Sequence, residues 1–129
     1  MGRPRGFDEE AVVRAAVALF ARRAYDGLSV DDLVTGLGVH RNSLYKTFGS
    51  KRGLYLAALR KYLEDPRALL DGDRLDLLLL AAAEQAPLDA EVGALISGAL
   101  ARLDEELGAD ETDRTLGARL RARIDTGEQ

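Results

Sequence analysis

The stretch SVDDLVTGLGVHRNSLYKTFGSK, residues 29–51, decides the fold of this chain. Ser29 is predicted to cap a helix, with the carboxylate of Asp32 near the positive end of that helix. Apolar residues then recur at helical spacing until Gly38, where glycine accepts the left-handed conformation of a helix C-terminus. A second helix is predicted over residues 40–48. Helix, glycine turn and helix is the layout of a helix-turn-helix DNA-binding motif.

The second helix of this stretch indicates the class of function. Its outward side chains all form hydrogen bonds and none is acidic. Arginine suits guanine and asparagine suits adenine in the major groove, so Arg41 and Asn42 are predicted to read bases. The remaining polar side chains are typical phosphate partners, and they are His40, Ser43, Tyr45, Lys46 and Thr47. The alternative is an ordinary solvated helix face.

A longer segment, AAVALFARRAYDGLSVDDLVTGLGVHRNSLYKTFGSKRGLYLAAL, resembles the N-terminal DNA-binding domain of the TetR (tetracycline repressor) family of bacterial regulators. The matching features are Ala-Ala and Leu-Phe in the first helix, Ser-Val-x-Asp-Leu, the Gly-Val turn, Leu-Tyr-x-x-Phe and the following Ser-Lys. The resemblance is strong over about residues 3–59 and weak beyond them. It implies a three-helix DNA-binding domain followed by a linker helix.

Four residues depart from the family pattern. Ala24 stands where the family usually has glycine, and Leu37 replaces a usual alanine; both are interpreted as packing changes. Asn42 replaces a usual glycine or alanine, and Thr47 replaces a frequent histidine. Because the last two lie on the DNA-facing surface, we expect them to change the target sequence rather than the act of binding.

Further DNA contacts are expected outside the second helix. Residues 1–6, MGRPRG, are predicted to form a flexible basic arm. Such arms lie in the minor groove or on phosphates, and GRPR openings in the resembled family favour this role for Arg3 and Arg5. Lys51 lies in the first turn of a predicted helix, where a phosphate fits, and the resemblance implies that contact. Ser29 is a further candidate. A disordered tail and a solvated lysine are the plain alternatives.

Composition favours an all-α protein that binds nucleic acid through one half. The 129 residues are 47% hydrophobic, with little proline and no strand-like alternation. Residues 1–64 carry 11 Lys and Arg against 7 Asp and Glu, whereas residues 65–129 carry 7 against 15. A basic half beside an acidic half suits a DNA-binding lobe and a regulatory lobe, although chance asymmetry would produce the same pattern.

Other classes of protein find little support in the sequence. The single histidine is His40, on the predicted DNA-binding helix, and no cysteine is present. We therefore expect no enzyme activity, no metal site and no cofactor. No apolar run approaches the roughly 20 residues of a membrane span, and the N-terminus lacks a signal-peptide core. The cytoplasm is the expected location.

The expected organisation is a flexible arm, a DNA-binding domain, a linker helix and an abbreviated helical lobe, at residues 1–6, 7–50, 51–65 and 66–129. Helices are predicted over residues 7–25, 50–64, 74–86, 89–107 and 111–124. The segment 75–83 is apolar nearly all round, so an exposed leucine-rich surface is expected to drive self-association.

Two functions remain open from the sequence. The first is a repressor that binds a palindromic operator as a homodimer. The second is a shortened, non-enzymatic interaction module that forms heterodimers with a full-length regulator and modulates it. A small-molecule effector is implied by the resemblance alone, and the short second lobe argues against a large enclosed pocket.

Overall fold

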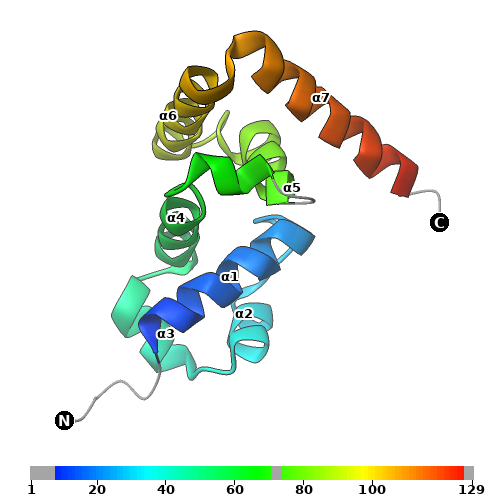
Figure 1. Ribbon diagram of the computed structural model, residues 1–129. Coiled ribbons are helices and arrows are strands. Elements are labelled where there is room, and N and C mark those ends of the chain that lie inside the picture. The colour runs from blue at the N-terminus through cyan, green and yellow to red at the C-terminus, as the bar shows by residue number, and fades with distance from the viewer. Residues whose placement is uncertain (1–7, 71–73, 127–129) are drawn as a thin grey trace. The chain divides into compact units, whose positions relative to one another are not determined.

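The computed structural model describes residues 8–70 and 74–126, and these residues form helices joined by short turns (Figure 1). Among them there is no strand, so the predicted all-α class is confirmed. The chain divides into two compact units after Tyr62, here called the N-terminal unit and the C-terminal unit. The elements are α1 (Glu9–Arg23), α2 (Val30–Leu37), α3 (Arg41–Phe48), α4 (Lys51–Tyr62), the 3-10 helix η1 (Pro66–Leu70), α5 (Leu75–Leu80), the π-helical turn η3 (Ala81–Gln85), α6 (Ala90–Leu107) and α7 (Ala109–Thr126).

Helices of the N-terminal unit begin and end where local chemistry dictates. The Asp8 carboxylate caps α1 by accepting from two backbone N–H groups at 3.1 and 3.3 Å. Ser29 and Asp32 form a full capping box on α2, with bonds of 3.0 and 2.9 Å. Gly38 ends α2 at φ 68° and ψ 34°, in the left-handed region where glycine is unstrained. Ser29 and Gly38 end the second helix where the sequence predicted, whereas the first helix spans Glu9–Arg23 and is shorter than the predicted residues 7–25.

One hydrophobic core holds the N-terminal unit together. α1 packs on α4 and α2, while α3 packs on α2 and α4. Each helix of the unit and the connection before α2 contribute fully buried side chains, and these include Phe20, Leu28, Leu33, Leu44, Leu54 and Leu59. Leu44 is the α3 member of this core, so the rest of that short helix is free to face outward.

The corner between α3 and α4 depends on a close backbone approach. Ser50 caps α4, because its hydroxyl oxygen accepts from the N–H of Gly53 at 2.9 Å. A Cβ atom at Gly53 would lie 1.9 Å from the carbonyl oxygen of Phe48. No L side chain fits at that distance, so glycine at this position allows α4 to start tightly against the end of α3.

Ala24 is a backbone adaptation rather than a packing change. It is the C-cap of α1, with φ 64° and ψ 170°. Among the described residues, it is the only residue other than glycine with a positive φ. This conformation is essentially a glycine conformation and costs an alanine about 1–3 kcal/mol. The sequence interpretation of Ala24 as a packing change did not include this backbone conformation. The family pattern places glycine there, and the backbone geometry shows why.

The C-terminal unit is organised around α6. Asp89 caps this helix, and its buried stripe is Val92, Ile96, Ala99 and Leu103. α6 packs on η1, η3 and α7, and α7 also packs on α5 (Figure 1). α5 and α7 are joined by an ion cluster in which the Asp76 carboxylate accepts from Arg119 at 2.7 and 3.1 Å and lies 3.3 Å from Arg123.

The helix expected over residues 74–86 changes its winding midway. After α5, the N–H of Ala86 bonds to the carbonyl of Ala81 at 2.8 Å, which is the π-helical pattern. α5 buries most of its apolar surface, so the expected exposed leucine surface over 75–83 was wrong. The large exposed apolar side chains of the described C-terminal unit lie elsewhere, at Leu88, Leu120 and Ile124. In the described part of the chain, no helix combines the length and apolar character needed to cross a membrane.

Candidate nucleic-acid interface

α3 presents the residues that the sequence predicted to contact DNA. Its single buried residue is Leu44, at 1% exposure, so the opposite side of the helix faces solvent. The side chains of His40, Arg41, Asn42 and Lys46 are exposed. Tyr45 is 40% exposed, and Ser43 and Thr47 are half-buried. The predicted residues of this helix are thus gathered on one accessible element.

Most of these side chains are not used by the protein itself. Within residues 8–70 and 74–126, no hydrogen bond or ion pair engages the side chains of six of them, namely His40, Asn42, Ser43, Tyr45, Lys46 and Thr47. Polar groups that point into water without an internal partner are available to an external one. None of the α3 side chains is acidic.

Arg41 is the exception on α3, since its Nη2 donates to Oδ1 of Asp31 on α2. The two side chains are 48% and 81% exposed. Asp31 is not among the residues that the sequence predicts to matter for binding, because an acid in the first turn of a helix is already explained by the helix dipole. Only the packing of α2 against α3 shows that it faces the predicted base-reading arginine.

Lys51 is positioned by an aromatic cluster. Its Nζ lies 4.1 Å from the centre of the Tyr25 ring, which is a cation–π contact. Tyr25 in turn meets Tyr55 at 4.7 Å between ring centres, and Tyr55 meets the buried Phe20 at 4.9 Å. The rings link the end of α1, the following turn and α4. They hold the Lys51 ammonium in the first turn of α4, where a phosphate contact was expected.

Ser29 serves as the N-cap of α2 in this structure, and its contact with DNA stays a prediction. The backbone N–H and the hydroxyl of Ser29 lower the pKa of Asp32 by hydrogen bonding to its carboxylate. Arg3 and Arg5, the predicted groove contacts of the arm, lie outside the described residues.

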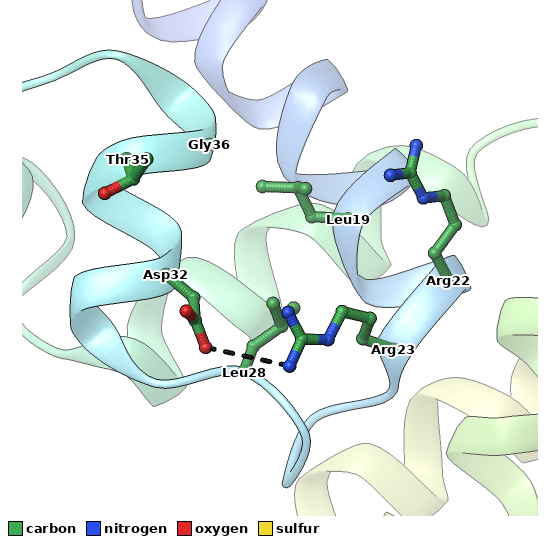
Figure 2. A pocket seen from close by; sticks show the side chains of 7 residues that line it. All are labelled: Leu19, Arg22, Arg23, Leu28, Asp32, Thr35 and Gly36. Atoms are coloured by element: carbon green, nitrogen blue, oxygen red, sulfur yellow. Dashed lines mark ion pairs between the residues drawn. The ribbon is translucent and has the colours of Figure 1, made fainter.

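A shallow hollow of about 280 Å³ lies between α1 and α2 (Figure 2). Its lining consists of Leu19, Arg22, Arg23, Leu28, Asp32, Thr35 and Gly36. The Arg23 guanidinium points across it to the Asp32 carboxylate at 4.0 Å. None of its lining residues comes from α3, so this hollow is separate from the polar face of that helix.

The chemistry available to the α3 face is recognition by hydrogen bonds and charge. Within the described ranges, no group of three or more His, Cys, Asp or Glu residues is placed to hold a metal ion. Guanidinium, amide, ammonium and hydroxyl groups on one exposed helix match the donors that contact base edges and phosphates.

Comparison with known proteins agrees with this geometry. The family described as bacterial regulatory proteins, tetR family, matches residues 12–58, which run from α1 into α4. The chain is 44% identical over 68 residues to the uncharacterized HTH-type transcriptional regulator YezE of Bacillus subtilis. It is 43% identical over 61 residues to the HTH-type transcriptional repressor BdcR of Escherichia coli. It is 32% identical over 47 residues to IcaR of Staphylococcus aureus, a negative transcriptional regulator of a biofilm operon.

These similarities are confined to part of each protein. The matches cover 53%, 47% and 36% of this chain, and 35%, 31% and 25% of the three relatives. The chain thus spans about a third of the length of the first two relatives. No solved structure showed a significant match. Residues 12–58 are the part of this chain that matches the tetR family of bacterial regulatory proteins.

Proposed function

We propose that this protein is a sequence-specific DNA-binding transcription regulator that acts as a repressor, with α3 in the major groove. The observation that carries the proposal is the α3 face, where six polar, non-acidic side chains have no partner among the described residues. Two of the relatives are named as a repressor and a negative regulator, which supports the direction of the effect. In this role the protein would bind DNA, and it would act in the cytoplasm.

The side chains divide into two groups by chemistry. Arg41 and Asn42 would read bases, because their donor and acceptor patterns match guanine and adenine edges. The others would hold phosphates or line the groove, which fixes the register of the helix without reading sequence. They are Ser29, His40, Ser43, Tyr45, Lys46, Thr47 and Lys51, with Arg3 and Arg5 of the N-terminal arm.

A homodimer on a palindromic operator is the arrangement we propose. Two copies related by a two-fold axis would place two α3 helices on successive major-groove faces. The support is the exposed pair Leu120 and Ile124 on α7, which are 52% and 65% accessible and four residues apart. Large apolar side chains on one helix face are typical of an association surface. Light scattering at micromolar concentration would give twice the 14.0 kDa chain mass, and a monomeric mass would contradict this part of the proposal.

The same apolar pair would equally serve a heterodimer with a full-length regulator, which is the second candidate. The two functions differ in whether the protein alone recognises DNA. A footprint on the DNA flanking its own gene, at two salt concentrations, separates them. We expect protection with two-fold symmetry that is lost steeply as salt rises, because phosphate contacts release counterions. Absence of protection at both salt concentrations, with folded protein, would favour the interaction module.

The division of roles within α3 and α4 has its own test. Arg41→Ala should cost about 1–3 kcal/mol on the protected site and relax its sequence preference. Lys51→Ala should weaken binding to all DNA alike and reduce the salt slope by about 1. Equal losses on the protected site and on random DNA for Arg41→Ala would contradict its role as a base reader.

A further inference from the structure

Asp31 is the one carboxylate that contacts a side chain of α3 among the described residues. It lies in the first turn of α2, and its Oδ1 accepts from Nη2 of Arg41. The partner is the residue that the proposed function assigns to guanine. A negative charge beside a DNA-binding surface opposes binding, so its presence there calls for a physical reason.

Capping does not supply that reason. The capping box of α2 is complete with Ser29 and Asp32. Within the described structure, the Asp31 carboxylate accepts no backbone N–H of its own helix and is bonded to Arg41 instead. Its side chain is 81% exposed, so burial does not hold it in place either. The contact with Arg41 is the feature that distinguishes Asp31 from an ordinary acid in a first turn.

A guanidinium group that is hydrogen-bonded through one nitrogen can adopt fewer orientations than a free one. Arginine carries several N–H donors in a rigid fork, so one bond to Asp31 leaves other donors for a base edge. A free arginine adjusts equally well to any nearby phosphate, whereas a held arginine favours a partner in the remaining direction. The partial neutralisation by Asp31 also weakens contacts that depend on charge alone. Both effects lower binding to random DNA relative to binding at a guanine.

We propose that Asp31 is a positioning residue for Arg41 and, through it, a determinant of guanine preference. This inference rests on the proposed function, because it concerns how the same helix selects its site. Asp31 itself need not contact DNA. The two residues act as a pair across the glycine turn that separates α2 from α3.

In vitro selection from a random duplex library tests the pair with the full chain. The proteins are the wild type, Asp31→Asn, Arg41→Ala and the double variant. Asp26→Asn is the matched control, since it removes one exposed negative charge from the same unit at a side chain with no partner among the described residues. Affinities for the selected duplex and for a scrambled duplex of equal length give the specificity ratio, and circular dichroism confirms folding.

Asp31→Asn should lower the preference for guanine by roughly two- to fivefold, the range expected from an exposed ion pair. The loss should fall at the base pair where Arg41→Ala abolishes preference, and other positions should keep theirs. In the Arg41→Ala background, Asp31→Asn should change the specificity ratio no further. Asp26→Asn should raise affinity slightly for both duplexes and leave their ratio unchanged.

Several results would overturn the inference. An unchanged guanine preference in Asp31→Asn would do so, as would an even loss across all base pairs. If Asp31→Asn changes the specificity ratio equally with and without Arg41, Asp31 acts through the overall electrostatic field and not through Arg41. If Arg41→Ala changes no base preference, the pair has no reading role although DNA binding stands. If the wild type selects no sequence at all, the proposed function fails and the inference fails with it.

Discussion

The polar face of α3 in the N-terminal unit and the Asp76 cluster in the C-terminal unit use their polar side chains in opposite ways. Among the described residues of the N-terminal unit, the polar side chains of α3 are largely unpaired and exposed, and the one ion pair that reaches them joins two exposed side chains. In the C-terminal unit, Asp76 is only 16% exposed and binds Arg119 and Arg123 between α5 and α7. The polar face of α3 is presented outward, whereas the Asp76 cluster joins two helices of its own unit.

This contrast follows from what each unit has available for folding. α3 is anchored by Leu44 and by its contacts with α2 and α4, so its stability does not require its polar face. None of the large apolar side chains described in α7 is buried. Its contact with α5 relies instead on arginines that bond to Asp76. The N-terminal unit therefore folds without engaging most of the polar face of α3, by means of its helix caps, its glycines and a small core.

The substitution with the greatest predicted loss of stability lies at the corner between α3 and α4. Gly53→Ala places a Cβ atom 1.9 Å from the Phe48 carbonyl oxygen, so α4 has to move away from α3. We expect a loss of about 3 kcal/mol in the free energy of unfolding, at the upper end for overpacking. Urea unfolding followed by circular dichroism measures it.

Gly98→Ala is the matched control, because a Cβ atom at this α6 position meets nothing within 4 Å. Alanine in an open helix position should stabilise the protein by about 0.5–1 kcal/mol. Similar effects of both substitutions would show that the corner between α3 and α4 is not tight.

The second prediction tests the internal ion cluster. Burial alone would raise the pKa of Asp76, but the hydrogen bonds and charges of Arg119 and Arg123 outweigh it, and the pKa lies below its ordinary value. Asp76→Asn should cost about 2 kcal/mol at pH 7, since hydrogen bonds to charged groups are lost. Glu105→Gln, at an exposed α6 side chain without a partner in the described structure, should change stability by less than about 0.5 kcal/mol.

The contribution of Asp76 should also depend on pH in a defined direction. A carboxylate whose pKa is lowered by folding stabilises the protein fully above its pKa in the unfolded chain, and this stabilisation is lost as pH falls through the folded pKa. The difference between wild type and Asp76→Asn should therefore be constant from pH 7 to about pH 5 and shrink below about pH 4. A difference that grows in acid would contradict the assigned cause.

The smallest predicted change is a gain in the stability of the N-terminal unit. Ala24→Gly relieves a backbone at φ 64° and ψ 170°, so we expect a gain of about 1 kcal/mol despite the entropy that glycine adds to the unfolded chain. Ala18→Gly, at an exposed position within α1, should instead cost about 1 kcal/mol. Thermal unfolding of the two variants should shift in opposite directions. A loss in both would show that the Ala24 conformation is not strained.

Much of the N-terminal unit could be predicted because its signals are local. Three of these signals act within a few residues and can therefore be predicted from neighbouring residues in the sequence. They are the capping box of α2, the left-handed Gly38 and the cap by Ser50. The outward face of α3 follows from helical periodicity. The winding of the segment after α5 could not be predicted in this way, because the same apolar residue pattern is compatible with an α-helix and with the π-helical turn η3.

The all-α class, the helix-turn-helix stretch and the polar residues of α3 can be predicted from the amino-acid sequence, since periodicity and capping are properties of short segments. The contacts between residues of different elements depend on how the helices pack. This packing pairs Asp31 with Arg41, places Lys51 over Tyr25 and joins Asp76 to the arginines of α7. These partners all lie at least ten residues apart in the sequence, and packing rather than local chemistry brings them together.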